Sequence, residues 1–276
     1  MSIDAILERI GHSGPFRPDV ETLRALHAAW RRTVPYENID IQLGRDIRLE
    51  PSALIAKFGP DRRGGTCYQL NGALALLLRG AGFRVTVHEA AVRRRSGGET
   101  EWGGHIALLV HLDAGTWLAD VGIADGFVEP LPLREGVHHQ GPLTYRLERV
   151  DATTWRWYHH ERGSIRSYDL RTAPRRLADF TRRATTRAAG SLMERLLIAY
   201  RLWDERSVTL LARTVTVATL DGTHVERRVL GDRDSFAAAL ADDIGVPLAD
   251  LGPEGIDTLW SRTTHQHAEW LARQEA

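Results

Sequence analysis

The stretch Arg63-Gly64-Gly65-Thr66-Cys67-Tyr68-Gln69-Leu70-Asn71 runs from a glycine turn directly into a strongly apolar helical pattern. Cys67 is the only cysteine in the 276-residue chain. At a helix start, unpaired backbone N–H groups and the positive end of the helix dipole stabilise a thiolate. The position therefore predicts a nucleophilic cysteine. The alternative is a buried cysteine that serves only as a small hydrophobic side chain, because free cysteine is among the most buried residue types.

A nucleophilic cysteine needs a base, and the base needs a group that fixes its orientation. His105 stands at the entrance of an apolar run, residues 105–112, that predicts a buried strand, and Asp120 lies in a second predicted strand, residues 116–122. A turn at residues 113–115 joins the two as an antiparallel hairpin. Because the start of one strand then lies beside the end of the next, His105 and Asp120 are expected at the same end of the hairpin. Cys67, His105 and Asp120 are the predicted catalytic triad.

With these residues in place, the chain resembles the arylamine N-acetyltransferase family. Residues 63–71 are similar to the nucleophile motif of that family, with His105 and Asp120 in the positions of its histidine and aspartate. Residues 34–40 and 118–131 are similar to further family segments, and residues 235–248 resemble its C-terminal end. The resemblance implies an enzyme with an α+β fold, in which an N-terminal helical bundle, a central antiparallel β-barrel and a C-terminal α/β lid surround a Cys-His-Asp core.

The resemblance also implies ping-pong acyl transfer. Cys67 would take an acetyl group from acetyl-coenzyme A, a co-substrate rather than a permanently bound cofactor. An arylamine, hydrazine or related amine would then attack the acetyl-cysteine while His105 takes its proton. Backbone N–H groups near Cys67 and Gly104 are the expected oxyanion donors. The side chains expected to form the apolar wall of the acceptor pocket are Tyr36, Tyr68, Ile123 and Phe127.

Three departures from the family pattern concern the pocket. Position 69 is Gln where the family usually has Glu, so a hydrogen-bonding role survives and a charged one is lost. Ile123 stands where the family often has Phe. Residues 182–192 replace an aromatic-Asn-aromatic stretch and a His-Pro-Ser-type turn. These changes leave the identities of the acyl donor and the amine acceptor open, whereas the triad residues match the family pattern.

Periodicity divides the chain into three predicted domains. Residues 1–85 are helix-rich, with Asp19 capping one helix, Ser52 beginning another and Cys67 opening a third. Residues 86–190 hold strand-like runs separated by Gly- and Asp-containing turns, which favours an antiparallel sheet or small barrel. Residues 191–276 are predicted to contain a helix over 192–203, strands near 207–210, 213–220 and 225–230, a helix over 236–244 capped by Asp234, and a final helix through Trp270.

Composition excludes several functions. The formal net charge is zero, so no global field attracts nucleic acid or an acidic membrane. Lys57 is the only lysine among 36 basic residues, and arginine runs such as 93–95, 175–176 and 182–183 are interpreted as solvated faces, one of which could hold a coenzyme phosphate. Adjacent histidines at 138–139 and 159–160, and the pair at 265 and 267, lack an accompanying ligand cluster, so no metal site is predicted.

The chain is expected in the cytoplasm. Residues 1–10 have charged and apolar residues at helical spacing and lack the features of a signal peptide. The longest apolar run, residues 73–78, is far shorter than the ~20 residues of a membrane span. A single cysteine also fits a reducing compartment, because it allows no intrachain disulfide.

Other functions remain open from the sequence alone. A transglutaminase-like thiol hydrolase would use the same triad order. A papain-type protease is disfavoured, because Cys67 and His105 are only 38 residues apart. A protein that keeps the triad but only binds ligands is a third possibility. Within the same fold, an amide synthase of natural-product biosynthesis would take its acyl group from a carrier-protein thioester.

Overall fold

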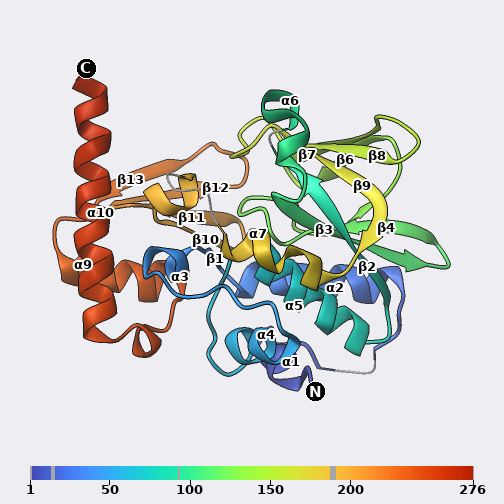
Figure 1. The fold of residues 1–276 in the computed structure, drawn as a ribbon, viewed down its shortest axis with the longest axis horizontal. Helices are drawn as coiled ribbons and strands as arrows, with labels where there is room; N and C mark the ends of the chain where they lie inside the picture. The colour runs from blue at the N-terminus through green and yellow to red at the C-terminus, as the bar shows by residue number, and fades with distance from the viewer. Residues whose placement is uncertain (1, 14–15, 93, 187–190, 276) are drawn as a thin grey trace.

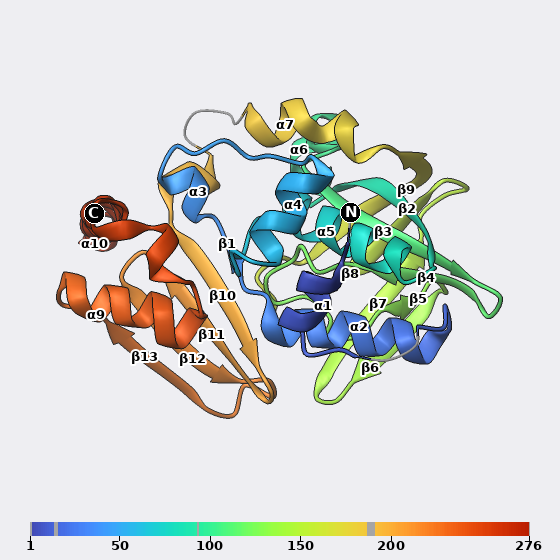
Figure 2. The same cartoon turned by 90° about the horizontal axis from the view of Figure 1, so that it is seen from below.

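The computed structural model describes residues 2–13, 16–92, 94–186 and 191–275. An eight-stranded antiparallel sheet curls into a nearly closed barrel, and a five-stranded antiparallel sheet lies to one side of it (Figure 1). Seen from below, the smaller sheet lies on one side of the molecule with α9 (Arg233–Ala238) and α10 (Gly252–Glu275) (Figure 2). The barrel lies on the other side with α2 (Val20–Thr33) and α5 (Cys67–Gly80). The fold is therefore α+β, as predicted.

The first helices lie in the helix-rich stretch predicted at residues 1–85, although the short helix at Ile39–Gln42 was not predicted. They are α1 (Asp4–Arg9), α2 (Val20–Thr33), α3 (Ile39–Gln42), α4 (Pro51–Phe58) and α5 (Cys67–Gly80). Asp19 caps α2 by accepting a hydrogen bond from the Thr22 N–H at 2.8 Å. Helix α4 starts one residue before the predicted Ser52, because Pro51 fits the first helical position, where no N–H is needed. Helix α5 starts at Cys67, and the Gln69 side chain accepts a long hydrogen bond, 3.5 Å, from the Thr66 N–H.

The barrel sheet has the strand order β5-β4-β3-β2-β9-β8-β7-β6. Its strands are β2 (Arg84–Ala91), β3 (His105–Leu112), β4 (Gly115–Ala119), β5 (Leu131–Pro132), β6 (Gly136–Gln140), β7 (Leu143–Arg149), β8 (Thr154–Tyr158) and β9 (Ser167–Arg175). Strand β4 ends at Ala119, three residues before the predicted end. The ladder stops there because the Val121 N–H donates to the Asn71 side chain instead of to a neighbouring strand.

The second sheet has the order β1-β10-β11-β12-β13. Its strands are β1 (Tyr36–Glu37), β10 (Ile198–Trp203), β11 (Arg206–Leu211), β12 (Thr214–Thr219) and β13 (Val225–Val229). The helix predicted over residues 192–203 is wrong: only Leu192–Arg195 is helical (α8), and β10 follows. Residues 198–203 pair along their whole length with β11 across a tight turn, and their buried side chains fit a strand. The tertiary pairing overrides the local helical pattern.

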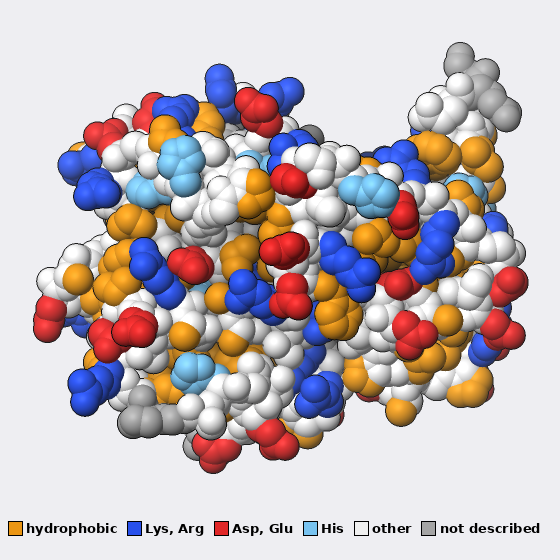
Figure 3. Space-filling view, turned by 180° about the vertical axis from the view of Figure 1, so that it is seen from behind, with side chains coloured by type: hydrophobic (Ala, Val, Ile, Leu, Met, Phe, Trp, Pro, Cys, Tyr) orange, Lys and Arg blue, Asp and Glu red, His pale blue; other side chains and the backbone are white. Residues whose placement is uncertain are grey.

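The remaining helices cap and flank the two sheets. They are α6 (Arg94–Gly97), α7 (Thr181–Thr185), α9 (Arg233–Ala238) and α10 (Gly252–Glu275), with 3₁₀ turns at Gly98–Glu101, Leu177–Phe180 and Leu248–Asp250 and a π-helical turn at Ala239–Ile244. Asp232, not the predicted Asp234, caps α9 by accepting from the Ser235 N–H at 2.8 Å, and the Ser235 hydroxyl group reinforces this turn. Helix α10 projects beyond the body (Figures 1 and 3).

Three hydrophobic clusters hold these layers together. One joins α2, α4 and α5 to a face of β2–β4, a second fills the barrel, and a third lies between the five-stranded sheet, α9 and α10. None of the described helices combines the length and the apolar character that crossing a bilayer demands. On the face drawn in Figure 3, basic and acidic side chains are interspersed, as the zero net charge leads one to expect.

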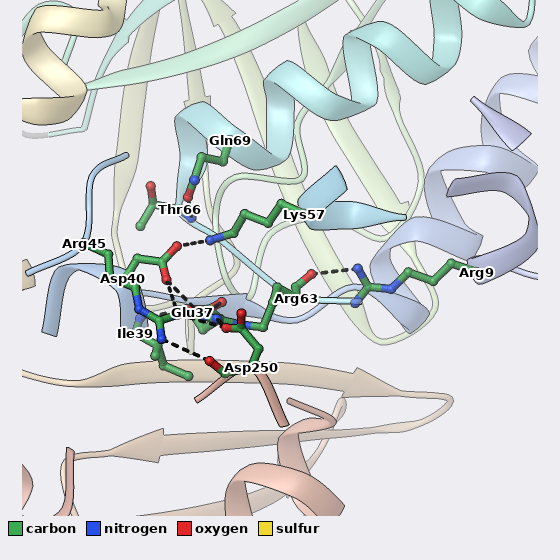
Figure 4. A network of polar contacts seen from close by, with 10 residues as sticks. All are labelled: Arg9, Glu37, Ile39, Asp40, Arg45, Lys57, Arg63, Thr66, Gln69 and Asp250. Atoms are coloured by element: carbon green, nitrogen blue, oxygen red, sulfur yellow. Dashed lines mark hydrogen bonds and ion pairs between the residues drawn. The ribbon is translucent and has the colours of Figure 1, made fainter. Parts of the chain in front are cut away.

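A buried ionic network ties the loop before Cys67 to the rest of the molecule (Figure 4). Arg63 is only 3% exposed, and its Nη2 lies 2.9 Å from Glu37 Oε1 and 3.3 Å from Asp40 Oδ1. Its Nη1 pairs with Asp250, which precedes α10, and Arg9 Nη1 donates to the Arg63 carbonyl at 2.6 Å. Because Arg63 precedes the glycine turn, the network fixes the approach to the first turn of α5.

Candidate active site

Cys67, His105 and Asp120 come together at one end of the hairpin. His105 opens β3 and Asp120 directly follows β4, and His105 Nε2 lies 2.7 Å from Asp120 Oδ2. Both residues are only 1% exposed. Cys67, half-buried at the first position of α5, lies close enough to the imidazole to help raise the pKa of His105. The imidazole and the carboxylate thus form a hydrogen-bonded pair beside the thiol.

The electrostatics of the pair favour a charged histidine. Burial by itself disfavours the imidazolium, but the Asp120 charge and the hydrogen bonds to Asp120 and Cys67 outweigh it and raise the pKa of His105 to about 10. Burial likewise opposes the Asp120 carboxylate, yet His105, Asn71 and the Gly122 N–H hold its pKa below the usual value. At neutral pH, Cys67 therefore faces an imidazolium, which is the partner that activates a thiol nucleophile.

The Asp120 carboxylate is held by groups that were not predicted. Asn71 lies one helical turn after Cys67, and its Nδ2 donates to Asp120 Oδ1 at 2.8 Å and to the Ile106 carbonyl at 2.7 Å. The Gly122 N–H donates to the same Oδ1 at 2.8 Å. The i, i+4 spacing from the nucleophile was the available signal for Asn71, because side chains at that spacing share a helix face.

The thiol opens into a cleft of about 940 Å³. Of the predicted substrate-binding residues, Tyr36, Tyr68, Gly104 and Ile123 line this cleft. The Tyr68 hydroxyl group donates to the Gly103 carbonyl at 2.6 Å and so braces the turn before His105. The far wall comes from the C-terminal sheet and the segment before it, and its lining residues are Leu192, Met193, Leu196, Ile198, Tyr200, Thr209 and Leu211.

Two predicted contributions do not fit this geometry. Phe127 is 1% exposed and packs inside the barrel against His27, Tyr145 and Trp157, so it is a core residue and does not line the cleft. The Gly104 N–H donates to the Glu101 carbonyl at 3.0 Å and is already engaged. The N–H groups at the start of α5 remain the candidate oxyanion donors.

The divergent stretch at residues 182–192 does border the cleft. Arg183, Thr186, Ser191 and Leu192 line it, whereas residues 187–190 lie outside the described residues, as does the first arginine of the 93–95 run. Arg183 Nη2 donates to the Thr100 carbonyl at 2.9 Å. Arg166 also lines the cleft, so two guanidinium groups stand at a mainly apolar surface.

A histidine pair does meet a carboxylate, which sequence spacing did not reveal. Potential ligand atoms of Asp125, His159 and His160 lie within 4.8 Å of one another. However, the His160 N–H donates to His159 Nδ1 at 2.8 Å, so the ring proton sits on Nε2 and is donated to Asp125 at 3.1 Å. A metal on Nε2 would force that proton onto Nδ1, against the His160 N–H. The observed bonds fit a histidine that links two segments of the chain better than a metal ligand.

Comparison with known proteins places this site in a family. A family model described as N-acetyltransferase matches residues 19–251. An arylamine N-acetyltransferase of Escherichia coli is 30% identical over 249 residues, which cover 88% of each chain. The chain belongs to the arylamine N-acetyltransferase family. This confirms the resemblance predicted from residues 63–71, 105 and 120.

Other members of the arylamine N-acetyltransferase family show the same relation. An arylamine N-acetyltransferase/N-hydroxyarylamine O-acetyltransferase of Salmonella typhimurium is 37% identical over 166 residues, an alignment that spans 55% of this chain and 56% of that protein. The solved structure of the Mycobacterium marinum arylamine N-acetyltransferase in complex with CoA has a TM-score of 0.84 and 26% identity, and covers 95% of this chain and 98% of that one. The similarity extends through the barrel and the C-terminal sheet, which confirms the predicted architecture.

Proposed function

We propose that this chain transfers an acetyl group from acetyl-coenzyme A to the nitrogen of an arylamine or hydrazine through an acetyl-Cys67 intermediate. One observation carries the proposal: the Asp120–His105 pair, joined by a hydrogen bond of 2.7 Å, lies beside a half-buried Cys67 that opens into the cleft. The family relation and the CoA complex of a structural neighbour support the choice of donor.

In the first half-reaction, the Cys67 thiolate attacks the thioester carbonyl carbon. The carbon–sulfur bond to coenzyme A breaks, and His105 gives its proton to the departing coenzyme A thiolate. Asp120 keeps the imidazole ring in place and stabilises its charged form. Arg166 and Arg183 place positive charge at the cleft, which suits a donor that carries phosphates.

In the second half-reaction, the amine nitrogen attacks the acetyl-cysteine carbonyl. His105, now neutral, takes a proton from that nitrogen, and Cys67 leaves as a thiolate beside the restored imidazolium. The acetyl group has moved from sulfur to nitrogen and all protons are accounted for. Tyr36, Tyr68 and Ile123 provide an apolar surface next to the thiol, which suits an aromatic acceptor and limits attack by water.

The direct test is the mass of the intact protein after mixing with acetyl-coenzyme A. We expect one added acetyl group on the native chain, none on Cys67→Ala, and loss of the group when an aminobenzoate or a hydrazide is added. Acetylation followed by rapid loss to water alone would instead indicate a thiol hydrolase. An unmodified protein whose thiol still alkylates rapidly would show that acetyl-coenzyme A is not the donor.

We also place the enzyme in the cytoplasm. A single, half-buried thiol that must stay reduced to act as a nucleophile supports this location.

A further inference from the structure

Helix α2 presents two polar side chains to the loop that carries Asp120. His27 and Arg31 are one helical turn apart on the buried face of α2, and the loop runs from Asp120 to Val128. The same loop supplies Ile123 to the cleft. Helix α2, which lies outside the barrel, therefore supports two things: the segment that holds the candidate base in position, and the cleft wall beside the thiol.

Arg31 binds the middle of this loop. Its Nη1 donates to the Ile123 carbonyl at 3.1 Å, and its Nη2 donates to the Ala124 and Gly126 carbonyls at 2.7 and 3.2 Å. The side chain is 4% exposed, and among the described residues its hydrogen-bond partners are carbonyl groups rather than a carboxylate. A buried guanidinium group that is compensated mainly by carbonyl dipoles holds those dipoles in one arrangement.

The same guanidinium group reaches the opposite wall of the cleft. It lies 6.0 Å from the ring centroid of Tyr200, a residue of β10 that lines the cleft. Arg31 is not itself among the described residues that line the cleft. Arg31 therefore contacts a residue in each of two cleft walls, Ile123 in the loop after β4 and Tyr200 in the C-terminal sheet, without lining the cleft itself.

His27 holds the two ends of the loop. Its Nε2 accepts from the Asp120 N–H at 3.3 Å, and its Nδ1 donates to the Val128 carbonyl at 2.7 Å. The ends of the loop, and with them Asp120, are thus held by contacts that do not involve Arg31. His27 therefore supports the triad, whereas Arg31 supports the cleft wall.

We propose that Arg31 is a positioning residue that sets the selectivity of the enzyme for its acceptor amine. The inference rests on the proposed function, because in a ping-pong reaction the donor and the acceptor react in separate steps. Loosening the Ile123–Gly126 segment widens the cleft beside the thiol, which weakens the fit of a small acceptor more than that of a bulky one. Acylation of Cys67 depends on the triad, which His27 and Asn71 continue to hold.

The experiment measures the two half-reactions separately in Arg31→Met and Arg31→Lys. For Arg31→Met we expect discharge of acetyl-Cys67 by a single-ring arylamine to lose about tenfold in kcat/KM, whereas discharge by a two-ring arylamine and acylation by acetyl-coenzyme A change less than about twofold. Arg31→Lys keeps a buried cation and should recover part of the small-acceptor rate. Arg32→Met, an exposed neighbour on α2, is the matched control and should behave as the wild type.

An unchanged ratio between the small and the large acceptor in both Arg31 variants would overturn the inference, as would an equal fall of acylation and discharge. If Arg31→Met does not fold, the acceptor ratio of Arg31→Lys decides. Failure of the proposed function gives a different result, since the wild-type chain would then not become acetylated at all.

Discussion

Asn71 joins the nucleophile helix to the base and its carboxylate. Its Nδ2 donates to Asp120 Oδ1, and its Oδ1 accepts from the Val121 N–H at 2.9 Å, so one amide group orients both the carboxylate and the chain that carries it. We expect Asn71→Ala to lower the rate of Cys67 acylation by about a hundredfold, because Asp120 then loses the donor opposite His105. Asn71→Asp should lower the acylation rate further, because it places a second carboxylate next to Asp120. Single-turnover acylation measures both, and a loss below about twofold in Asn71→Ala would refute this role.

Residue types and spacing point to the three members of the candidate triad, because few arrangements of cysteine, histidine and aspartate combine a helix start with one end of a hairpin. The structure brings His105 and Asp120 into contact, and their catalytic role stays a prediction. The surrounding groups were harder. Phe127 was assigned to the cleft, but the path of the loop turns it into the barrel core. His27 and Arg31 lie on a helix whose partner loop is more than 90 residues away, and no local pattern shows that contact.

The first turn of α5 and the loop after β4 are in direct contact at Gly122. A Cβ atom there would lie 2.8 Å from both Cα and Cβ of Cys67 and 2.6 Å from Asn71 Nδ2. Glycine is thus required for space, and Gly122→Ala must push these two elements apart. We expect at least about a tenfold loss of acylation, measured together with the melting temperature. Gly255→Ala in α10, whose nearest contact would be an ordinary 3.5 Å, is the control and should leave acylation unchanged. Full acylation by Gly122→Ala would contradict the tight contact.

Local sequence signals predict helices α2 and α5 and several strands, and they fail where pairing with a distant segment determines the structure. The cap at Asp19 and the start at Cys67 are encoded by neighbouring residues. Strand β10 was predicted as a helix because its apolar residues also fit helical spacing, and its pairing with Tyr36–Glu37 involves residues about 160 positions away. That pairing also links the first predicted domain to the last, so the proposed division at residues 85 and 190 is crossed by a sheet.

Buried histidines should give the stability of the whole molecule a maximum near pH 6.5. Burial lowers the pKa of His27, His88 and His160 to about 4, whereas an unfolded histidine titrates near 6.5. Between about pH 6.5 and 4 the unfolded chain binds more protons at these sites, so the free energy of unfolding falls as the pH is lowered. His105 acts in the opposite sense. Because the pKa of His105 is about 10 in the folded state, its contribution to the free energy of unfolding is complete below about pH 6.5. That contribution is lost as the pH rises toward 10.

Urea unfolding at pH 5, 6.5 and 9, followed by tryptophan fluorescence, tests this maximum. The wild-type chain should have its highest free energy of unfolding at pH 6.5 and lower values on both sides. His105→Gln removes the only group among these four that binds its proton more tightly in the folded state, so this variant should lose the decline between pH 6.5 and 9 and keep the decline toward pH 5. If the variant and the wild type show the same slope on the alkaline side, the imidazolium–carboxylate pair contributes no pH-dependent stability, and Cys67 does not face a charged histidine at neutral pH.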